Sequence, residues 1–343
     1  MQISFHNSLN QLTAKMVALL WKQWSSLGVA GYGDPTDDSI IDPEALLLCT
    51  THFGRYDSRL MDHAIDWLVK NGNIISVQRL QGHEKNWPSV ADARVLSAIA
   101  EILCCDVMHR KWRVIADRPA LGVASEFLFL AKESGALMPI AEPDPFFEKH
   151  GLLREPLQLR GMSLAPDPSN RQNLLLSLRA LLGVNARAEI IAWLLAHESG
   201  HPAAIARATG YFSKSVQQIL NEMLVSGQLG ATRIGREKHF FLRRRQDWQN
   251  LLFPMKAELQ VFPRWVDWMP LYAAIAGFAQ ALSLSQIDEK SPSFQSIQLR
   301  EAFLQAMPAL TRSGKIFQMQ ASPEMRGAEM ITSLLADINA LIP

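Results

Sequence analysis

Glycine and proline punctuate the segment Arg187–Arg245 at short intervals, and this spacing restricts its fold more than any other feature of the sequence. A helical pattern over Arg187–His197 places four aliphatic residues on one face and ends at a Ser-Gly pair. A second, short helix is predicted over Pro202–Ala208, because proline fits the first helical position, where its missing N–H is not needed. Thr209 and Gly210 then supply a tight turn.

A third helix is predicted over Lys214–Val225, with Ser213 as its N-cap. Its apolar residues recur at helical spacing and form one face: Val216, Ile219, Leu220, Met223 and Leu224. The opposite face carries side chains that donate and accept hydrogen bonds: Lys214, Gln217, Gln218 and Asn221. Such side chains suit the base edges and phosphates of a DNA major groove, so this face is a candidate DNA-binding site.

A β-hairpin is predicted next, since the strand-like runs LGATRI and KHFFL are joined by Gly235-Arg236-Glu237. Four cationic or titratable residues lie on or near it: Arg233, Arg236, Lys238 and His239. From His201 to Arg245 the chain has eight Lys or Arg and two acidic residues, a local net charge of +6, whereas the whole chain carries +1. Concentrated positive charge supplies the sequence-independent part of DNA affinity.

This stretch resembles the winged helix-turn-helix transcription regulators of the bacterial ArsR and MarR kind. HPAAIARATG matches the positioning helix, SKSVQQILNEMLVSG the recognition helix and ATRIGREKHFFL the wing. The resemblance implies that double-stranded DNA is the partner. It places Lys214, Gln217, Gln218 and Asn221 in the major groove, and Arg233, Arg236 and Lys238 near the backbone or minor groove. It covers about 60 of the 343 residues.

Composition indicates a packed protein of the cytoplasm. The chain is 48% hydrophobic and 20% charged, which provides material for folded cores. It has three cysteines and no CxxC pair, which argues against a disulfide framework or a zinc ribbon and fits a reducing compartment. The first residues lack a basic segment followed by an apolar run, so no secretory signal is expected.

The remaining sequence predicts a mainly α, multi-domain protein with the winged helix-turn-helix (α+β) domain in its centre. We expect a mostly helical domain over 1–165, the winged helix-turn-helix domain over 170–246 and a helical region over 247–343. Further helices are predicted over 9–27, 43–51, 57–71, 89–103, 120–132, 172–182, 271–284, 296–307 and 323–341. The run NIISVQRL, residues 73–80, is predicted as a strand.

Residues 43–80 echo the central segment, since a helix that ends at Gly72 is followed by the predicted strand. A second, degenerate winged helix over 43–80 is therefore an alternative to a plain helical region. The helix–glycine–strand arrangement is common, so the plain helical region is favoured.

The uncharged stretch Trp268–Ile287 is about long enough to cross a membrane. Pro270 and several Ser and Gln residues interrupt it, and only Leu271–Leu282 is truly apolar, so a buried helix and no membrane partner are expected. The small residues of Leu271–Leu284 would also let another helix approach closely. A homodimer contact through this segment and an ordinary core helix therefore remain as alternatives.

The run His197–His201 matches the zinc-protease motif HExxH, but we reject this interpretation. That chemistry needs both histidines on one helix so that they hold one metal ion. Gly200 lies between them, and Pro202 disfavours helical geometry at His201. We expect a turn here and no metal.

Two other groups of reactive side chains lack a partner motif. Thr51–Asp57 (THFGRYD) could support acid–base chemistry, yet it falls at a predicted turn between helices. Cys104 and Cys105 could sense redox state or a metal, yet no neighbouring ligand set is complete, and buried free cysteines are common. No P-loop, GxGxxG or GxSxG motif is present, so neither an enzyme nor a cofactor is expected.

The sequence therefore predicts a DNA-binding transcriptional regulator. The candidate DNA-binding residues are Ser213, Lys214, Gln217, Gln218, Asn221, Arg233, Arg236, Lys238 and His239. The alternative is a protein-interaction component, such as an antitoxin-like or defence-system subunit, that uses the winged helix as a scaffold. An effector ligand, the operator and the roles of 1–165 and 247–343 are left open by the sequence.

Overall fold

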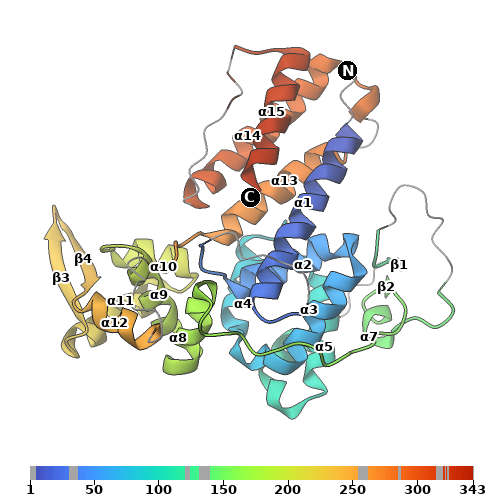
Figure 1. The fold of residues 1–343 in the computed structure, drawn as a ribbon. Helices are drawn as coiled ribbons and strands as arrows, with labels where there is room; N and C mark the ends of the chain where they lie inside the picture. Colours follow the sequence, from blue (N-terminus) through green and yellow to red (C-terminus); the bar gives the residue numbers. More distant parts are fainter. Residues whose placement is uncertain are drawn as a thin grey trace.

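The computed structural model describes residues 5–30, 38–119, 124–130, 140–253, 262–284, 287–313, 320, 322 and 324–342. The described part is mainly helical, as predicted, and holds two two-stranded sheets (Figure 1). Its buried apolar residues form two clusters. One cluster joins both ends of the chain into what we call the body, residues 5–173 and 264–342; the other fills the central unit, residues 174–253.

Five helices build the first part of the body: α1 (Phe5–Ser26), α2 (Pro43–Phe53), α3 (Ser58–Asn71), α4 (Val77–Asn86) and α5 (Ala93–Cys104). Most begin where a short polar side chain caps the first turn. Asp42, Asp57 and Asp92 each accept two backbone N–H groups, and Ser76 accepts one. The helices predicted over 43–51 and 57–71 are confirmed as α2 and α3. Their starts were predictable because such caps depend only on neighbouring residues.

Short elements complete this part of the body: α6 (Arg113–Ala116), α7 (Pro145–Glu148), β1 (Glu126–Phe127) and β2 (Leu152–Leu153). β1 and β2 pair in parallel, with Phe127 opposite Leu153. The helix predicted over 120–132 is wrong for residues 124–130, which include β1, and the rest of it lies outside the described residues.

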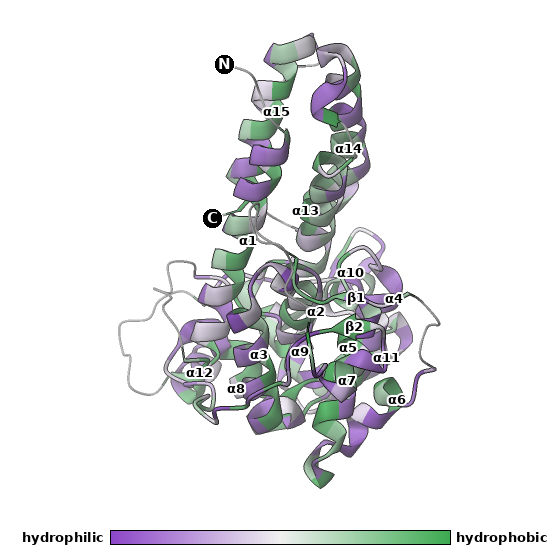
Figure 2. Ribbon diagram, turned by 90° about the vertical axis from the view of Figure 1, so that its right-hand side faces the viewer, coloured by the Kyte–Doolittle hydropathy of each residue, from purple (hydrophilic) through white to green (hydrophobic). Residues whose placement is uncertain are grey.

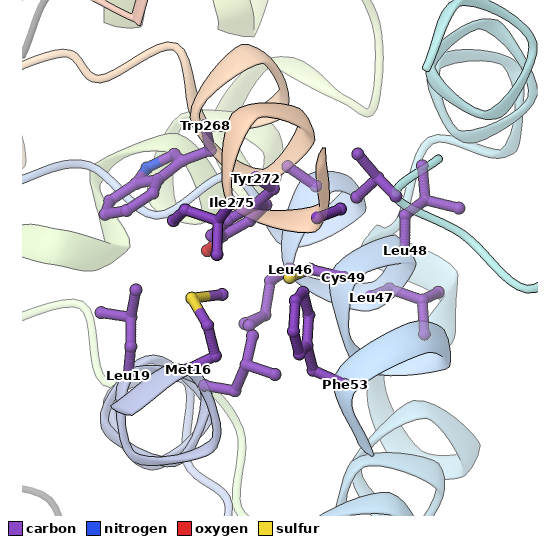
Figure 3. Packing of buried hydrophobic residues seen from close by; sticks show 14 of the residues in the cluster. Met16, Leu19, Leu46, Leu47, Leu48, Cys49, Phe53, Trp268, Tyr272 and Ile275 are labelled. Atoms are coloured by element: carbon purple, nitrogen blue, oxygen red, sulfur yellow. The ribbon is translucent and has the colours of Figure 1, made fainter. Parts of the chain in front are cut away.

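The C-terminal helices are α13 (Trp268–Leu282), α14 (Pro292–Ser313) and α15 (Gly327–Leu341). α13 and α15 pack with α1, and α14 packs with α13 and α15. Together they rise above the rest of the molecule (Figures 1 and 2). α13 inserts Trp268, Tyr272 and Ile275 among side chains of α1 and α2 (Figure 3). Of the two alternatives for this segment, the core helix within one chain is the one observed. Within the described residues, no helix has both the length and the apolarity needed to cross a membrane.

The central unit contains the predicted three helices and hairpin, flanked by two further helices. Its elements are α8 (Leu174–Leu182), α9 (Ala186–Ala196), α10 (Pro202–Thr209), α11 (Ser213–Val225), β3 (Leu229–Ile234), β4 (Glu237–Leu242) and α12 (Arg245–Leu252). β3 and β4 are antiparallel, and Gly235 with a φ of 60° makes the turn between them. Gly200 and Phe240 exchange two 2.9 Å backbone hydrogen bonds, which tie β4 to the α9–α10 turn.

The two segments that connect the body to the central unit lie side by side. Arg264 O accepts a hydrogen bond from Ile40 N (2.8 Å), and Gln172 O accepts one from Ile41 N (3.0 Å). The chain therefore leaves the body at residue 172 and returns at residue 264 beside the same two residues.

The strand predicted over 73–80 is wrong, since these residues form a 3-10 turn and the start of α4. Ile74 and Ile75 favour a strand, but the Ser76 hydroxyl accepts the Arg79 N–H and starts a helix that buries Val77 and Leu80. The second winged helix considered over 43–80 relied on that strand, and residues 43–80 form only helices and turns.

Candidate nucleic-acid interface

The polar face of α11 is exposed to solvent because the helix packs through its apolar face. Val216, Leu220 and Met223 are buried against α9 and α10. The side chains on the other face are exposed, and four of them line a shallow depression together with Glu222 and Val225: Lys214, Gln217, Gln218 and Asn221. Ser213 is also exposed. It is the first helical residue rather than the predicted N-cap, since Phe212 occupies that position and no side chain bonds there.

Hydrogen bonds already engage part of this face. Gln218 Nε2 donates to Glu222 Oε1 (3.0 Å), and Glu222 also pairs with Arg187 of α9 (2.5 Å). Within the described residues, the side chains of Lys214 and Gln217 make no hydrogen bond to the rest of the protein. These two side chains are therefore the ones best able to bind an external partner.

The hairpin brings its cations next to α11. Lys238 Nζ donates to Asn221 Oδ1 (3.4 Å) and lies 4.7 Å from the centroid of the Phe240 ring. Arg233 is the cross-strand partner of Lys238, so both side chains project from the same face of the hairpin. Arg236 is exposed in the turn. The hairpin also lies at the outer end of the central unit, away from the body (Figure 1).

His239 does not join this group, because side chains alternate along a strand and it projects from the opposite face to Lys238. Its ring lies 6.0 Å from that of His201 and is 3.6 Å from Glu237 Oε2. Of the nine predicted residues, the structure therefore gathers seven near α11 and one face of the hairpin, leaves Arg236 at the tip, and sets His239 apart.

Arg245 belongs to the fold rather than to the exposed surface. It donates to the carbonyl oxygens of Leu195 and His197 at the end of α9, and it lies over the Phe262 ring. Fewer basic side chains are therefore available to a partner than the eight Lys and Arg counted in the sequence from His201 to Arg245. Two exposed apolar side chains flank the polar face of α11 and were missed by the sequence reasoning: Phe212 (77% exposed) before it and Val225 (89%) at its end.

The histidines of the HExxH run play separate structural roles. The His197 ring stacks on Trp193 at 3.8 Å just beyond the end of α9. His201 is the N-cap of α10, and its Nδ1 accepts the Ala203 N–H (3.3 Å). The two histidines thus do not share a helix, as the glycine and proline between and after them predicted.

A buried network of charges was also missed, and it joins the central unit to the body. Arg179 of α8 donates to both oxygens of Glu44 of α2 (2.7 and 2.8 Å) and to Glu189 of α9 (2.6 and 2.9 Å). Arg79 of α4 pairs with Glu44 and Asp42. The side chains of Arg79, Arg179, Glu44 and Glu189 are all 0% exposed. Burial opposes charge on Arg79 and Arg179, but the facing carboxylates outweigh it and raise the pKa of both arginines.

The same junction holds the end of α10. Arg79 Nε donates to Thr209 O (2.7 Å), and Arg312 of α14 donates to Arg207 O (2.9 Å). Asp267 pairs with Arg312 at 3.3 Å, yet burial dominates and raises the pKa of Asp267 to about 7. His83 is buried beside Gly210, and burial together with the charge of Arg79 lowers the pKa of His83 to about 4. The end of α10 and the turn before α11 are thus held by contacts from α4 and from α14 of the body.

No protein-family model matches this chain, and no curated protein or solved structure is significantly similar to it. The chemistry of the exposed surfaces is therefore the basis for assigning a function.

Proposed function

We propose that the central unit is a winged helix that binds double-stranded DNA, and that the protein is a transcriptional regulator of the cytoplasm. The observation that carries the proposal is the joint exposure of the α11 polar face and the adjoining hairpin cations, linked through Lys238 and Asn221. Glutamine and asparagine match the donor and acceptor pattern of adenine in the major groove, whereas arginine and lysine match phosphates.

The body would set the direction in which this surface points. The buried contacts of Arg79 with Thr209 O and of Arg179 with Glu44 fix the central unit to α4 and α2 rather than leaving it on a flexible linker. A single unit of this size reads too few base pairs to find one site in a genome, so we expect two copies on symmetric half-sites. Because α13 is buried within the chain, the contact between copies would use another surface.

The proposal is tested by measuring DNA affinity against salt concentration. Replacing Arg233, Arg236 and Lys238 by Ala should weaken binding to every sequence. It should also lower the slope of log affinity against log salt by about one unit for each phosphate that the variant no longer neutralises. The matched control replaces three exposed cations of the body, Arg113, Lys290 and Arg300, none of which belongs to the central unit, and should leave both quantities unchanged.

Fragments selected from genomic DNA by the purified protein should share a motif. Wild-type protein that binds no DNA at low salt, or a hairpin variant that binds as the control does, would overturn the proposal. The first outcome would favour the interaction-component alternative.

A further inference from the structure

A hollow of about 480 Å³ lies between α3 and the β1–β2 ribbon, in the body and apart from α11. This volume is within the range of small-molecule binding sites. Its walls combine aromatic rings, guanidinium groups and carboxylates, so it differs from an ordinary packing defect, which is lined by apolar groups.

The aromatic wall follows from strand geometry. Side chains alternate across β1 and the residues after it, so Leu128 points into the core (0% exposed) while Phe127 and Phe129 point to the hollow. Both rings remain only half-buried. Phenyl rings left open beside polar groups provide a stacking surface for a flat ring.

The floor of the hollow is held in place by an ion pair between a buried arginine and a half-buried aspartate. Arg154 is 4% exposed, its Nη1 donates to Asp62 Oδ1 of α3 (2.7 Å), and its guanidinium lies 5.3 and 5.2 Å from the rings of Phe129 and Phe147. This arrangement fixes both the position of the Phe129 ring and the carboxylate of Asp62.

Two further arginines stand at the rim, Arg59 in the first turn of α3 and Arg160. Within the described residues, neither guanidinium has an ion pair or a hydrogen bond. Arg160 is positioned because the following segment wraps Asp66, whose carboxylate accepts from Gly161 N (2.7 Å) and Ser163 N (3.0 Å). Paired guanidinium groups recognise phosphate through several hydrogen bonds at once.

We propose that this hollow binds a nucleoside monophosphate. The phosphate would lie between Arg59 and Arg160, and the base would stack on Phe127 and Phe129. Ribose hydroxyls would donate to Asp62 of α3 and to Glu155, which follows β2; both carboxylates line the hollow. A simple aromatic acid would use the rings and arginines but would leave Glu155 without a donor, and Asp62 with Arg154 alone. The site does not depend on the DNA-binding proposal, because none of its residues belongs to the central unit.

The test is calorimetric titration of the full chain with adenosine, guanosine, cytidine and uridine monophosphates. At least one should bind with a dissociation constant below ~1 mM, which corresponds to about −4 kcal/mol. The double variant Arg59→Gln/Arg160→Gln should weaken that affinity at least tenfold. Arg113→Gln, an exposed arginine elsewhere on the body, should not weaken it.

The unphosphorylated nucleoside separates the phosphate contribution from the ring contribution, since it should bind wild type and double variant equally weakly. Because Arg59 and Arg160 are exposed, their replacement should leave the unfolding temperature unchanged, which excludes loss of fold as the cause. Absence of binding for all four nucleotides, equal affinity in the double variant, or preference for benzoate over every nucleotide would each overturn the assignment.

Discussion

Arg179 and Glu44 form a bidentate ion pair across the junction of the central unit and the body. Arg179 Nη1 lies 2.7 Å from Glu44 Oε1, and Nη2 lies 2.8 Å from Oε2. Both side chains are fully buried. A buried pair of this kind adds little stability compared with apolar residues of the same shape, but it strongly disfavours any arrangement that separates its members. It therefore specifies how the two parts of the chain fit together.

Replacing Arg179 by Met should cost about 3–5 kcal/mol of unfolding free energy, because Glu44 loses its bidentate partner and Glu189 its only one among the described residues. Urea denaturation would measure the loss. The matched control is Arg187→Met in the same unit, whose pair with Glu222 is about half exposed and should contribute less than about 1 kcal/mol. Equal stability of the two variants would contradict a structural role for the network.

Base recognition by α11 should depend more on Gln217 than on Gln218, since Gln218 is already bonded to Glu222. Gln217→Ala should relax the preference at one base position by about 1–3 kcal/mol. Binding to a selected fragment and to its single-base variants measures this, with Gln218→Ala as the companion variant. If both variants keep the wild-type preference, direct readout by this helix is wrong.

Two adjacent residues of α13, Ala276 and Gly277, should differ in their tolerance of a glutamate. Ala276 is 4% exposed, so Ala276→Glu would bury a carboxylate without a partner and should destabilise the chain by several kcal/mol, on the order of the desolvation penalty. Gly277 has open space where a Cβ would lie, so Gly277→Glu should be tolerated. Thermal unfolding and chromatography compare the two. An Ala276→Glu chain that stays folded while changing its oligomeric state would restore the dimer interpretation of this helix.

Two buried groups at the junction should give the stability opposite dependences on pH. The pKa of His83 is lowered to about 4 in the folded chain, so its contribution is present above pH 6.5 and is lost as pH falls towards 4. The pKa of Asp267 is raised to about 7, so its contribution is present below pH 3.8 and is lost as pH rises towards 7.

Removing one group should therefore expose the effect of the other. Between pH 4 and 7, His83→Gln should make stability fall more steeply with rising pH, whereas Asp267→Asn should make it rise more steeply. Denaturation at several pH values measures both slopes. Slopes that do not move in opposite directions would contradict the two pKa shifts.

Local signals made most of the helices predictable from sequence. The caps at Asp42 and Asp57 and the first-turn prolines Pro43 and Pro202 act within a few residues, so the sequence states them directly. The error at 73–80 has the opposite origin. The β-branched Ile74 and Ile75 favour a strand, and this preference outweighed the single local signal for a helix, the Ser76 cap.

The exposed face of α11 was predictable because helical periodicity alone separates Val216 and Leu220 from Gln217. The contact of Lys238 with Asn221 was not, since it depends on how the hairpin lies against the helix.

The charge network was not predictable either, because Glu44 and Arg179 are 135 residues apart and Glu44 has the appearance of an ordinary first-turn acid. Arg179 within the run LLLSLRALL was a signal, since a single cation in an apolar helix needs a buried partner. The sequence could therefore show that a partner was needed, but only the fold shows which carboxylate supplies it.

The neighbouring crossings at Ile40–Arg264 and Ile41–Gln172 make the central unit a side branch of the chain rather than a link in it. A short loop could bridge residues 172 and 264, and the body would keep its own core of N- and C-terminal helices. Such an excision would still leave Glu44 without Arg179, so it would have to neutralise that carboxylate as well. The topology would thus allow the central unit to be removed or replaced, but the surface of the body beneath it carries a charge that matches Arg179 of this unit.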